Sequence, residues 1–259
     1  MKALLEPKEA YEQQFEANTI VLDVRKPHEY AQGHLERAHH LTREALQPHP
    51  PTLITQPQLE SVLRNLGVNH NTTLILTDGR GGYDACYLWF LLRVYGFHTA
   101  AVVSGGYEGC VFDRVPLTTA LPATLPVGDV ALSPRLDTHY ADYAVVTQAT
   151  STTALLDVRS IDEFQGKPPA YDQCRLGRIP NSVHLDYREA LDQTKGNKFK
   201  TKQALLDCYQ EYLKQPVIVY CQVGVRSALT FFVLTALLDH PNVKNYAGSW
   251  LDYNLHHSF

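Results

Sequence analysis

The chain lacks the sequence features of a membrane, secreted or metal-binding protein. No run of about 18 apolar residues occurs, so we expect no transmembrane helix. The N-terminal segment soon becomes acidic and polar and has no apolar signal core, which favours a cytoplasmic location. Its 5 cysteines include no Cys-x-x-Cys pair, and its 12 histidines include no His-Glu-x-x-His motif. We therefore expect free thiols in a reducing compartment, with no disulfide framework, no metal and no cofactor.

An excess of basic residues is also missing. The sequence has 23 lysines and arginines against 27 aspartates and glutamates, a formal net charge of −4 at pH 7. No large basic face is implied, so we expect neither a nucleic-acid nor a membrane partner. A small anionic ligand needs only local positive potential and stays compatible with this balance. The length of 259 residues and the hydrophobic content of 44% favour two packed domains.

The two halves of the chain repeat one pattern. Residues 20–30 and 154–164 share an apolar run, then Asp-Val-Arg, then an acidic and an aromatic residue. Three more segments match in the same order: residues 32–41 with 176–185, 73–92 with 217–238, and 102–109 with 245–252. In this register Asp78 lies opposite Cys221, and Tyr107 lies opposite Trp250. The offset is 134 for the first match and 143 or 144 for the others, which indicates one insertion of about nine residues near GKPPAYDQC. Four matches in the same order predict a duplicated domain.

Each copy alternates short apolar strands with helical patterns, which predicts an α/β fold: a mostly parallel sheet with helices on both faces. The expected strands lie around residues 20–24, 73–77, 154–158 and 217–220. A proline-rich segment from Leu117 onward marks the boundary between the copies. We predict an N-terminal domain at 1–118, a linker at 119–127 and a C-terminal domain at 128–259. Both Asp78 and Cys221 then follow a strand, at the sheet edge where such folds bind ligands.

The turn after the last of these strands is the strongest candidate site. Its residues are Cys221, Gln222, Val223, Gly224, Val225, Arg226 and Ser227. Successive amides of such a turn can point inward toward an anion, aided by the N-terminus of the next helix. Gly224 permits a positive φ, and Arg226 adds a cation. A thiol placed there ionises readily, so Cys221 is the predicted nucleophile and the other residues are the predicted anion-binding set, Ser227 through its amide or as a helix cap.

The doubled Asp-Val-Arg pattern, the Cys221 turn and the closing segment NYAGSW together resemble the two-domain rhodanese family, which comprises thiosulfate and 3-mercaptopyruvate sulfurtransferases. The resemblance covers nearly the whole chain. It implies that the C-terminal copy is catalytic and that the N-terminal copy, with Asp78 at the cysteine position, is an inactive scaffold beside the cleft. Phosphatases of this fold have a Cys-x5-Arg loop, whereas Cys221 to Arg226 is Cys-x4-Arg. The shorter loop suits one sulfur atom better than a phosphoryl group.

Side chains around the turn bear on the sulfur donor. Mercaptopyruvate enzymes of the family usually have a small neutral loop and a separate arginine for the donor carboxylate. Here the loop holds Gln222 and Arg226, and the position of that arginine holds Glu163. The resemblance therefore favours thiosulfate as donor, passed through a Cys221 persulfide to cyanide or a thiol. The alternatives are a 3-mercaptopyruvate sulfurtransferase, a persulfide carrier for a protein acceptor and, more remotely, a phosphatase.

Several other residues have structural or supporting roles in this interpretation. Asp157 and Arg159 recur in the inactive copy, so we expect a charge pair that joins the strand end to the next loop. Tyr187, Trp250 and Tyr107 line the cleft or belong to the core. Cys174 is close enough in the predicted fold to be considered for an inhibitory disulfide with Cys221. The remaining cysteines, Cys86, Cys110 and Cys208, are expected to be bystanders.

Overall fold

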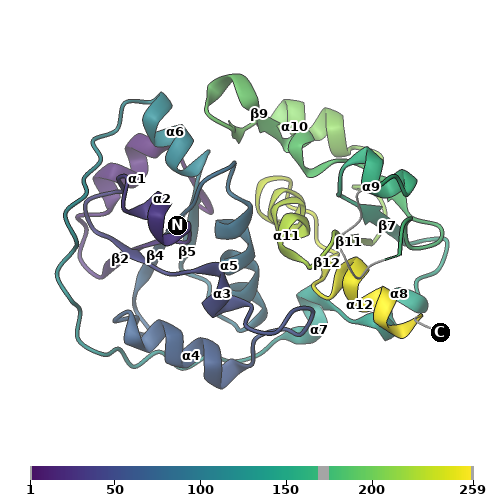
Figure 1. Ribbon diagram of the computed structural model, residues 1–259, viewed down its shortest axis with the longest axis horizontal. Helices are drawn as coiled ribbons and strands as arrows, with labels where there is room; N and C mark the ends of the chain where they lie inside the picture. The colour runs from purple at the N-terminus through teal and green to yellow at the C-terminus, as the bar shows by residue number, and fades with distance from the viewer. Residues whose placement is uncertain (1, 169–174, 258–259) are drawn as a thin grey trace. The chain divides into compact units, whose positions relative to one another are not determined.

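The computed structural model describes residues 2–168 and 175–257 (Figure 1). The predicted redox role of Cys174 falls outside these residues. By its internal contacts the chain forms two compact units. Unit 1 runs from the N-terminus to Pro48 and includes Ile54–Arg135 and Leu191–Phe199; unit 2 comprises His49–Leu53, Leu136–Ala190 and the chain from Lys200 onward.

Unit 1 is built on a five-stranded sheet in the order β1-β5-β4-β2-β3, and every strand pair is parallel. Its strands are β1 (Leu4–Leu5), β2 (Thr19–Asp23), β3 (Ala38–His40), β4 (Thr73–Thr77) and β5 (Ala100–Val103). Its helices are α1 (Pro7–Gln13), α2 (Pro27–Tyr30), α3 (Arg43–Leu46), α4 (Gln56–Asn65), α5 (Tyr83–Val94) and α6 (Gly106–Phe112). Strand β5 is buried throughout, as in a sheet that helices cover on both faces.

Unit 2 repeats this architecture with the sheet order β6-β12-β11-β7-β8, again with parallel pairs only. Its strands are β6 (Tyr140–Ala141), β7 (Ala154–Asp157), β8 (Val183–His184), β11 (Val217–Tyr220) and β12 (Val243–Tyr246). Its helices are α7 (Leu136–His139), α8 (Tyr143–Thr147), α9 (Ile161–Gln165), the 3-10 turn η1 (Tyr187–Ala190), α10 (Lys202–Tyr209), α11 (Val225–Phe232), the π-helical turn η3 (Val233–Leu237) and α12 (Ser249–His256).

The predicted fold class is confirmed. The four expected strands are β2, β4, β7 and β11, each within one residue of its predicted bounds. Runs of β-branched and leucine residues form these central strands because such side chains fit a sheet that is buried on both faces. The central strands pair in register, for example Tyr220 with Asp157, so the residues that follow β7 and β11 emerge at the same sheet edge. Among the described residues, no helix is long and apolar enough to cross a membrane.

The units differ from the predicted domains in three places: the short segment His49–Leu53 belongs to unit 2, and two longer segments belong to unit 1. First, the proline-rich segment continues along unit 1 to Arg135: the amides of Gly128 and Val130 donate to the carbonyls of Arg64 and Val68. These bonds satisfy backbone groups in a segment that contains no helix or strand, so it packs as part of unit 1 rather than as a free linker.

Second, a hairpin from the C-terminal half belongs to unit 1. It comprises β9 (Leu191–Asp192), the 3-10 turn η2 (Gln193–Lys195) and β10 (Lys198–Phe199). The Lys198 ammonium lies 2.7 Å from a Glu6 carboxylate oxygen and 3.0 Å from one of Asp113. The Phe199 amide donates to the Ser104 hydroxyl over 3.2 Å. The ion pairs with Glu6 and Asp113 and the bond to Ser104, which follows β5, therefore join this hairpin to unit 1.

Candidate active site

The Cys221 turn connects a buried strand to an amphipathic helix. All four residues of β11 are buried, and Cys221, which follows them, is only 1% exposed. Helix α11 begins at Val225, and Gly224 before it has φ +85°. The connection is therefore shorter than the six-residue loop expected from sequence, and Arg226 lies in the first turn of the helix.

Hydrogen bonds to the first residues of α12 hold the backbone of the turn at Cys221 and Gln222. The Cys221 amide donates to the Ser249 hydroxyl over 3.0 Å, and that hydroxyl donates to the Tyr246 carbonyl over 2.7 Å. The amides of Trp250 and Leu251 donate to the carbonyls of Cys221 and Gln222, each over 3.0 Å. The backbone that carries the thiol is thus fixed before any ligand arrives.

The environment of the Cys221 thiol favours its ionised form. Burial by itself would raise its pKa, but the positive charge of Arg226 and the hydroxyl of Ser227 oppose that effect. The Ser227 oxygen lies 3.6 Å from the sulfur. Backbone amides of Val223 and Ser227 add to the opposition, and the pKa of Cys221 lies below its ordinary value as a result. A buried thiol whose surroundings lower its pKa has the character of a nucleophile rather than of a core residue.

Arg226 forms a bidentate ion pair with Glu163 of α9. Its two terminal nitrogens each lie 2.8 Å from a different carboxylate oxygen, and each side chain is 20% exposed. Ser160, the N-cap of α9, also bonds Glu163 through its amide and its hydroxyl. Burial would raise the pKa of the Glu163 carboxyl, yet the bonds to Arg226 and Ser160 lower it to about 2. Sequence reasoning treated the two charges separately, whereas the structure joins them.

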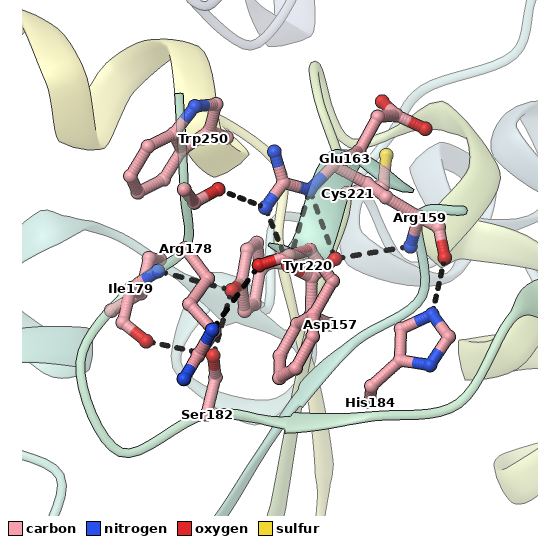
Figure 2. Close-up of polar contacts among 12 residues, drawn as sticks. Asp157, Arg159, Glu163, Arg178, Ile179, Ser182, His184, Tyr220, Cys221 and Trp250 are labelled. Carbon is pink, nitrogen blue, oxygen red and sulfur yellow. Dashed lines mark hydrogen bonds and ion pairs between the residues drawn. The ribbon is translucent and has the colours of Figure 1, made fainter. Parts of the chain in front are cut away.

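Asp157 and Arg159 form a second, fully buried ion pair (Figure 2). The Arg159 guanidinium donates to both carboxylate oxygens of Asp157 and to the Gly177 carbonyl, 2.8 Å away, so it links the end of β7 to a later loop. In unit 1, Arg25 bonds Asp23 and the Gly33 carbonyl in the same way. Because both copies have this arrangement, it fits a structural role; a further role in the site stays a prediction.

The predicted aromatic residues occupy different environments. Trp250 is 6% exposed, its indole N–H donates to the Arg175 carbonyl over 2.9 Å, and its ring belongs to the hydrophobic core of unit 2. Its backbone amide bonds the Cys221 carbonyl. Tyr187 is partly exposed on η1, with its amide bonded to the Val158 carbonyl. Tyr107, the counterpart of Trp250, lies under the Arg25 guanidinium, 4.3 Å from it.

The matching turn of unit 1 is occupied by its own carboxylate. Asp78 is completely buried, and one carboxylate oxygen accepts from the amides of Asp84 and Ala85 over 2.8 and 3.1 Å. Burial and the nearby Asp84 raise the pKa of Asp78 although those amide bonds act in the opposite direction. The N-terminus of α5 therefore already bonds an internal acid at the place where unit 2 has a thiol.

Two residues at the site were missed by sequence reasoning, Asn245 and Ser249. The Ser227 hydroxyl donates to the Asn245 carboxamide oxygen over 2.7 Å, and Ser249 receives the Cys221 amide. In the repeat register they lie opposite Val102 and Gly106. A polar residue that replaces an apolar one only in the copy with the cysteine is the signal that could have identified them. Among the described residues, no group of three or more His, Cys, Asp or Glu side chains could hold a metal ion.

Gly224 is expected to tolerate no side chain. An added Cβ would lie 2.2 Å from the Ala247 carbonyl oxygen, and φ is +85°, so Gly224→Ala combines a clash with backbone strain. Gly177 is a matched control, because φ there is +113° and nothing lies within 4 Å of its Cβ position. We expect urea denaturation to show a loss of about 1 kcal/mol for Gly177→Ala and at least about 2–3 kcal/mol for Gly224→Ala. Equal losses would show that the turn can shift away from Ala247.

A family model described as the rhodanese-like domain matches residues 6–111 and 141–256, one match in each copy. The chain belongs to the rhodanese-like family. A Mycobacterium bovis protein named "Putative thiosulfate sulfurtransferase 1" is 33% identical over 205 residues, which cover 76% of this chain and 73% of that protein. The Thermus thermophilus sulfur carrier protein TtuD is 27% identical over 241 residues, 86% of this chain and 83% of the relative.

A solved rhodanese structure supports the same membership. The crystal structure of SseA from Escherichia coli, described as a 3-mercaptopyruvate sulfotransferase, superposes with a TM-score of 0.82 at 25% identity. The match covers 96% of this chain and 99% of SseA. The likeness to SseA thus covers most of both chains, while the names of the relatives specify different sulfur compounds.

Proposed function

We propose that this rhodanese-like protein is a sulfurtransferase that moves the outer sulfur of thiosulfate through a Cys221 persulfide to cyanide or a thiol. One observation carries the proposal: Cys221 is buried and yet has a lowered pKa, because a cation, a hydroxyl and backbone amides surround it. The thiosulfate sulfurtransferase name of the mycobacterial relative supports the choice of donor. Of the predicted anion-binding set, the backbone of residues 222–225 and of Ser227 would contact the bound sulfur.

The reaction is a double displacement. The Cys221 thiolate attacks the outer sulfur of thiosulfate, an S–S bond forms to the enzyme, and the S–S bond of thiosulfate breaks with its electron pair leaving on sulfite. The resulting persulfide carries one negative charge. Cyanide then attacks its terminal sulfur, releases thiocyanate and restores the thiolate. Preorganised amides around the sulfur stabilise the charge in both steps without needing to reorient.

The donor is expected to be a dianion rather than a carboxylate. Arg226 already has a carboxylate partner in Glu163, so its guanidinium is not reserved for the carboxylate of 3-mercaptopyruvate. Thiosulfate needs no arginine reserved for a carboxylate, because its outer sulfur would be met by the backbone amides of the turn. The likeness to SseA keeps 3-mercaptopyruvate as the second candidate donor.

A protein acceptor is the second candidate function, because the Thermus thermophilus relative is named a sulfur carrier protein. A carrier would load sulfur on the same cysteine and release it only to its partner. Multiple-turnover formation of thiocyanate from thiosulfate and cyanide would separate the enzyme from the carrier.

Intact-mass measurement after incubation with thiosulfate is the direct test. We expect the chain to gain one sulfur atom, located on the peptide that contains Cys221 and removed again by cyanide. A chain incubated with sulfite alone is the control and should gain nothing. Absence of the gain with thiosulfate, while 3-mercaptopyruvate produces it, would transfer the proposal to that donor; absence with both would overturn it.

A further inference from the structure

Asn245 lies beneath the candidate active site in a completely buried position on β12. Its carboxamide bridges two parts of the turn. The amide nitrogen donates to the Gly224 carbonyl over 3.1 Å, and the carboxamide oxygen accepts from the Ser227 hydroxyl over 2.7 Å. A buried asparagine with both ends engaged is held in one orientation.

Hydrogen-bond chemistry determines that orientation. The Gly224 carbonyl can only accept, so the nitrogen of Asn245 must face it and the oxygen must face Ser227. The Ser227 hydroxyl then has one proton for two acceptors, the Asn245 oxygen at 2.7 Å and the Cys221 sulfur at 3.6 Å. While Cys221 is a neutral thiol, the closer oxygen holds the proton; once the thiolate forms, the charged sulfur competes for it.

The bond to Gly224 orients the turn as well. Its carbonyl shares a planar trans peptide with the Val225 amide, whose N–H must point the opposite way, toward the N-terminal end of α11. The hydrogen bond from Asn245 to the Gly224 carbonyl therefore also orients the Val225 amide, one of those proposed to bind sulfur. Gly224 cannot shift easily, because its Cα packs against the backbone of Ala247.

The other copy provides an internal comparison. Residue Val102 lies opposite Asn245 in the repeat, and Asp84 lies opposite Ser227. The Val102 side chain cannot form hydrogen bonds, and in unit 1 the carboxylate of Asp78 bonds the amides of Asp84 and Ala85 near the start of α5. The buried carboxamide thus occurs only in the copy with the cysteine, so the shared fold does not require it.

We propose that Asn245 is a positioning residue for Cys221, which sets the acidity of the thiol through Ser227 and the Gly224 carbonyl. This inference rests on Cys221 being the reacting group of the proposed function. Its consequence is that the pH dependence of Cys221 reactivity depends on a side chain that does not touch the sulfur.

The test uses Asn245→Asp, which keeps the shape and the acceptor for Ser227 but replaces the donor to Gly224 with an acid. When that acid ionises it places a like charge near the thiolate, so we expect the pH midpoint of Cys221 alkylation by iodoacetamide to rise by about one unit or more. The Cys221 peptide is followed by mass spectrometry in the absence of any sulfur donor. The measurement therefore does not require that the protein transfer sulfur, and its failure is distinguishable from failure of the proposed function.

Asn254→Asp is the matched control. Asn254 is 4% exposed, and its carboxamide accepts from the Arg175 amide and donates to the Trp250 carbonyl, but it bonds neither Ser227 nor Gly224. We expect it to lower stability and leave the alkylation midpoint in place. Asn245→Val introduces the residue found in the other copy and provides a second variant in case the aspartate variant does not fold. We expect it to slow alkylation of Cys221 near neutral pH. Unchanged midpoints and rates in both Asn245 variants, with folded protein by circular dichroism, would overturn the proposal.

Discussion

Replacing Cys221 with serine is expected to abolish sulfur transfer while leaving the fold intact. The hydroxyl cannot ionise under the same influences and cannot form a persulfide, so thiocyanate formation should fall by at least about 10³-fold. Serine matches cysteine closely in size, and the two backbone bonds of residue 221, to Ser249 and from Trp250, do not involve the sulfur. The measurement is thiocyanate release from thiosulfate and cyanide, together with the intact mass after thiosulfate alone.

Cys208→Ser is the control for this experiment. Cys208 is a free, partly exposed thiol on α10, and its sulfur has only a weak contact of 3.9 Å with the Glu189 carbonyl. Cys208 is a chemically accessible alternative site for a persulfide, and we expect the protein to keep full activity when it is replaced. Appreciable turnover in Cys221→Ser, or a loss of activity in Cys208→Ser alone, would show that the persulfide forms elsewhere.

The position of this thiol could be predicted from sequence because local and repeated signals agree. Strand β11 is a run of valine, isoleucine and tyrosine followed by Cys221, and the matching strand β4 is followed by Asp78. That β7 and β11 pair as parallel central strands follows from their burial on both faces, but their exact register does not, since a slip of one residue would leave the apolar side chains buried. Because the domain is duplicated, each half of the sequence independently indicates these strands and the sheet edge at which the candidate site lies.

Contacts between distant segments could not be predicted in this way. Glu163 and Arg226 are 63 residues apart, and only the packing of α9 beside α11 brings them together. The hairpin β9–β10 carries no strong periodicity, and its place in unit 1 depends on Lys198 meeting Glu6 and Asp113. The role of Asn245 depends on the direction in which one side chain of β12 points, and a lone asparagine in a strand has no motif.

The ion pair changes how the charge of Arg226 is understood. From sequence, Arg226 attracts the donor and Glu163 repels a carboxylate, as two independent effects. In the structure one guanidinium bonds Glu163 on one edge and lowers the pKa of Cys221 at the same time. Glu163 thereby holds the cation near the thiol and also reduces its net charge, so structural and catalytic contributions of Arg226 must be separated by experiment.

Arg226→Met is expected to impair both stability and sulfur uptake. It leaves the Glu163 carboxylate partly buried without its cation, which should lower the free energy of unfolding by about 2–3 kcal/mol, the low end for a broken buried pair because each side chain is one-fifth exposed. It also removes the positive charge that favours the Cys221 thiolate and the thiosulfate dianion. We expect the rate of sulfur uptake to fall by about 10²-fold, as when one donor to a developing anion is lost. Urea denaturation and rapid-quench mass spectrometry measure the two effects.

The double variant Glu163→Gln/Arg226→Met separates the effect of Arg226 on stability from its effect on sulfur uptake. Glutamine removes the unpaired charge but keeps the length of the side chain and an oxygen that can accept from Ser160, so stability should return close to the original value. Sulfur uptake should stay low, because no cation is restored beside Cys221. Recovery of uptake together with stability would instead mean that Arg226 serves only to pair Glu163, and that the amides of the turn alone stabilise the persulfide. The single variant Glu163→Gln completes the double-mutant cycle. Because the carboxylate no longer neutralises the Arg226 guanidinium, thiosulfate should bind about tenfold more tightly and the Cys221 thiol should ionise at lower pH.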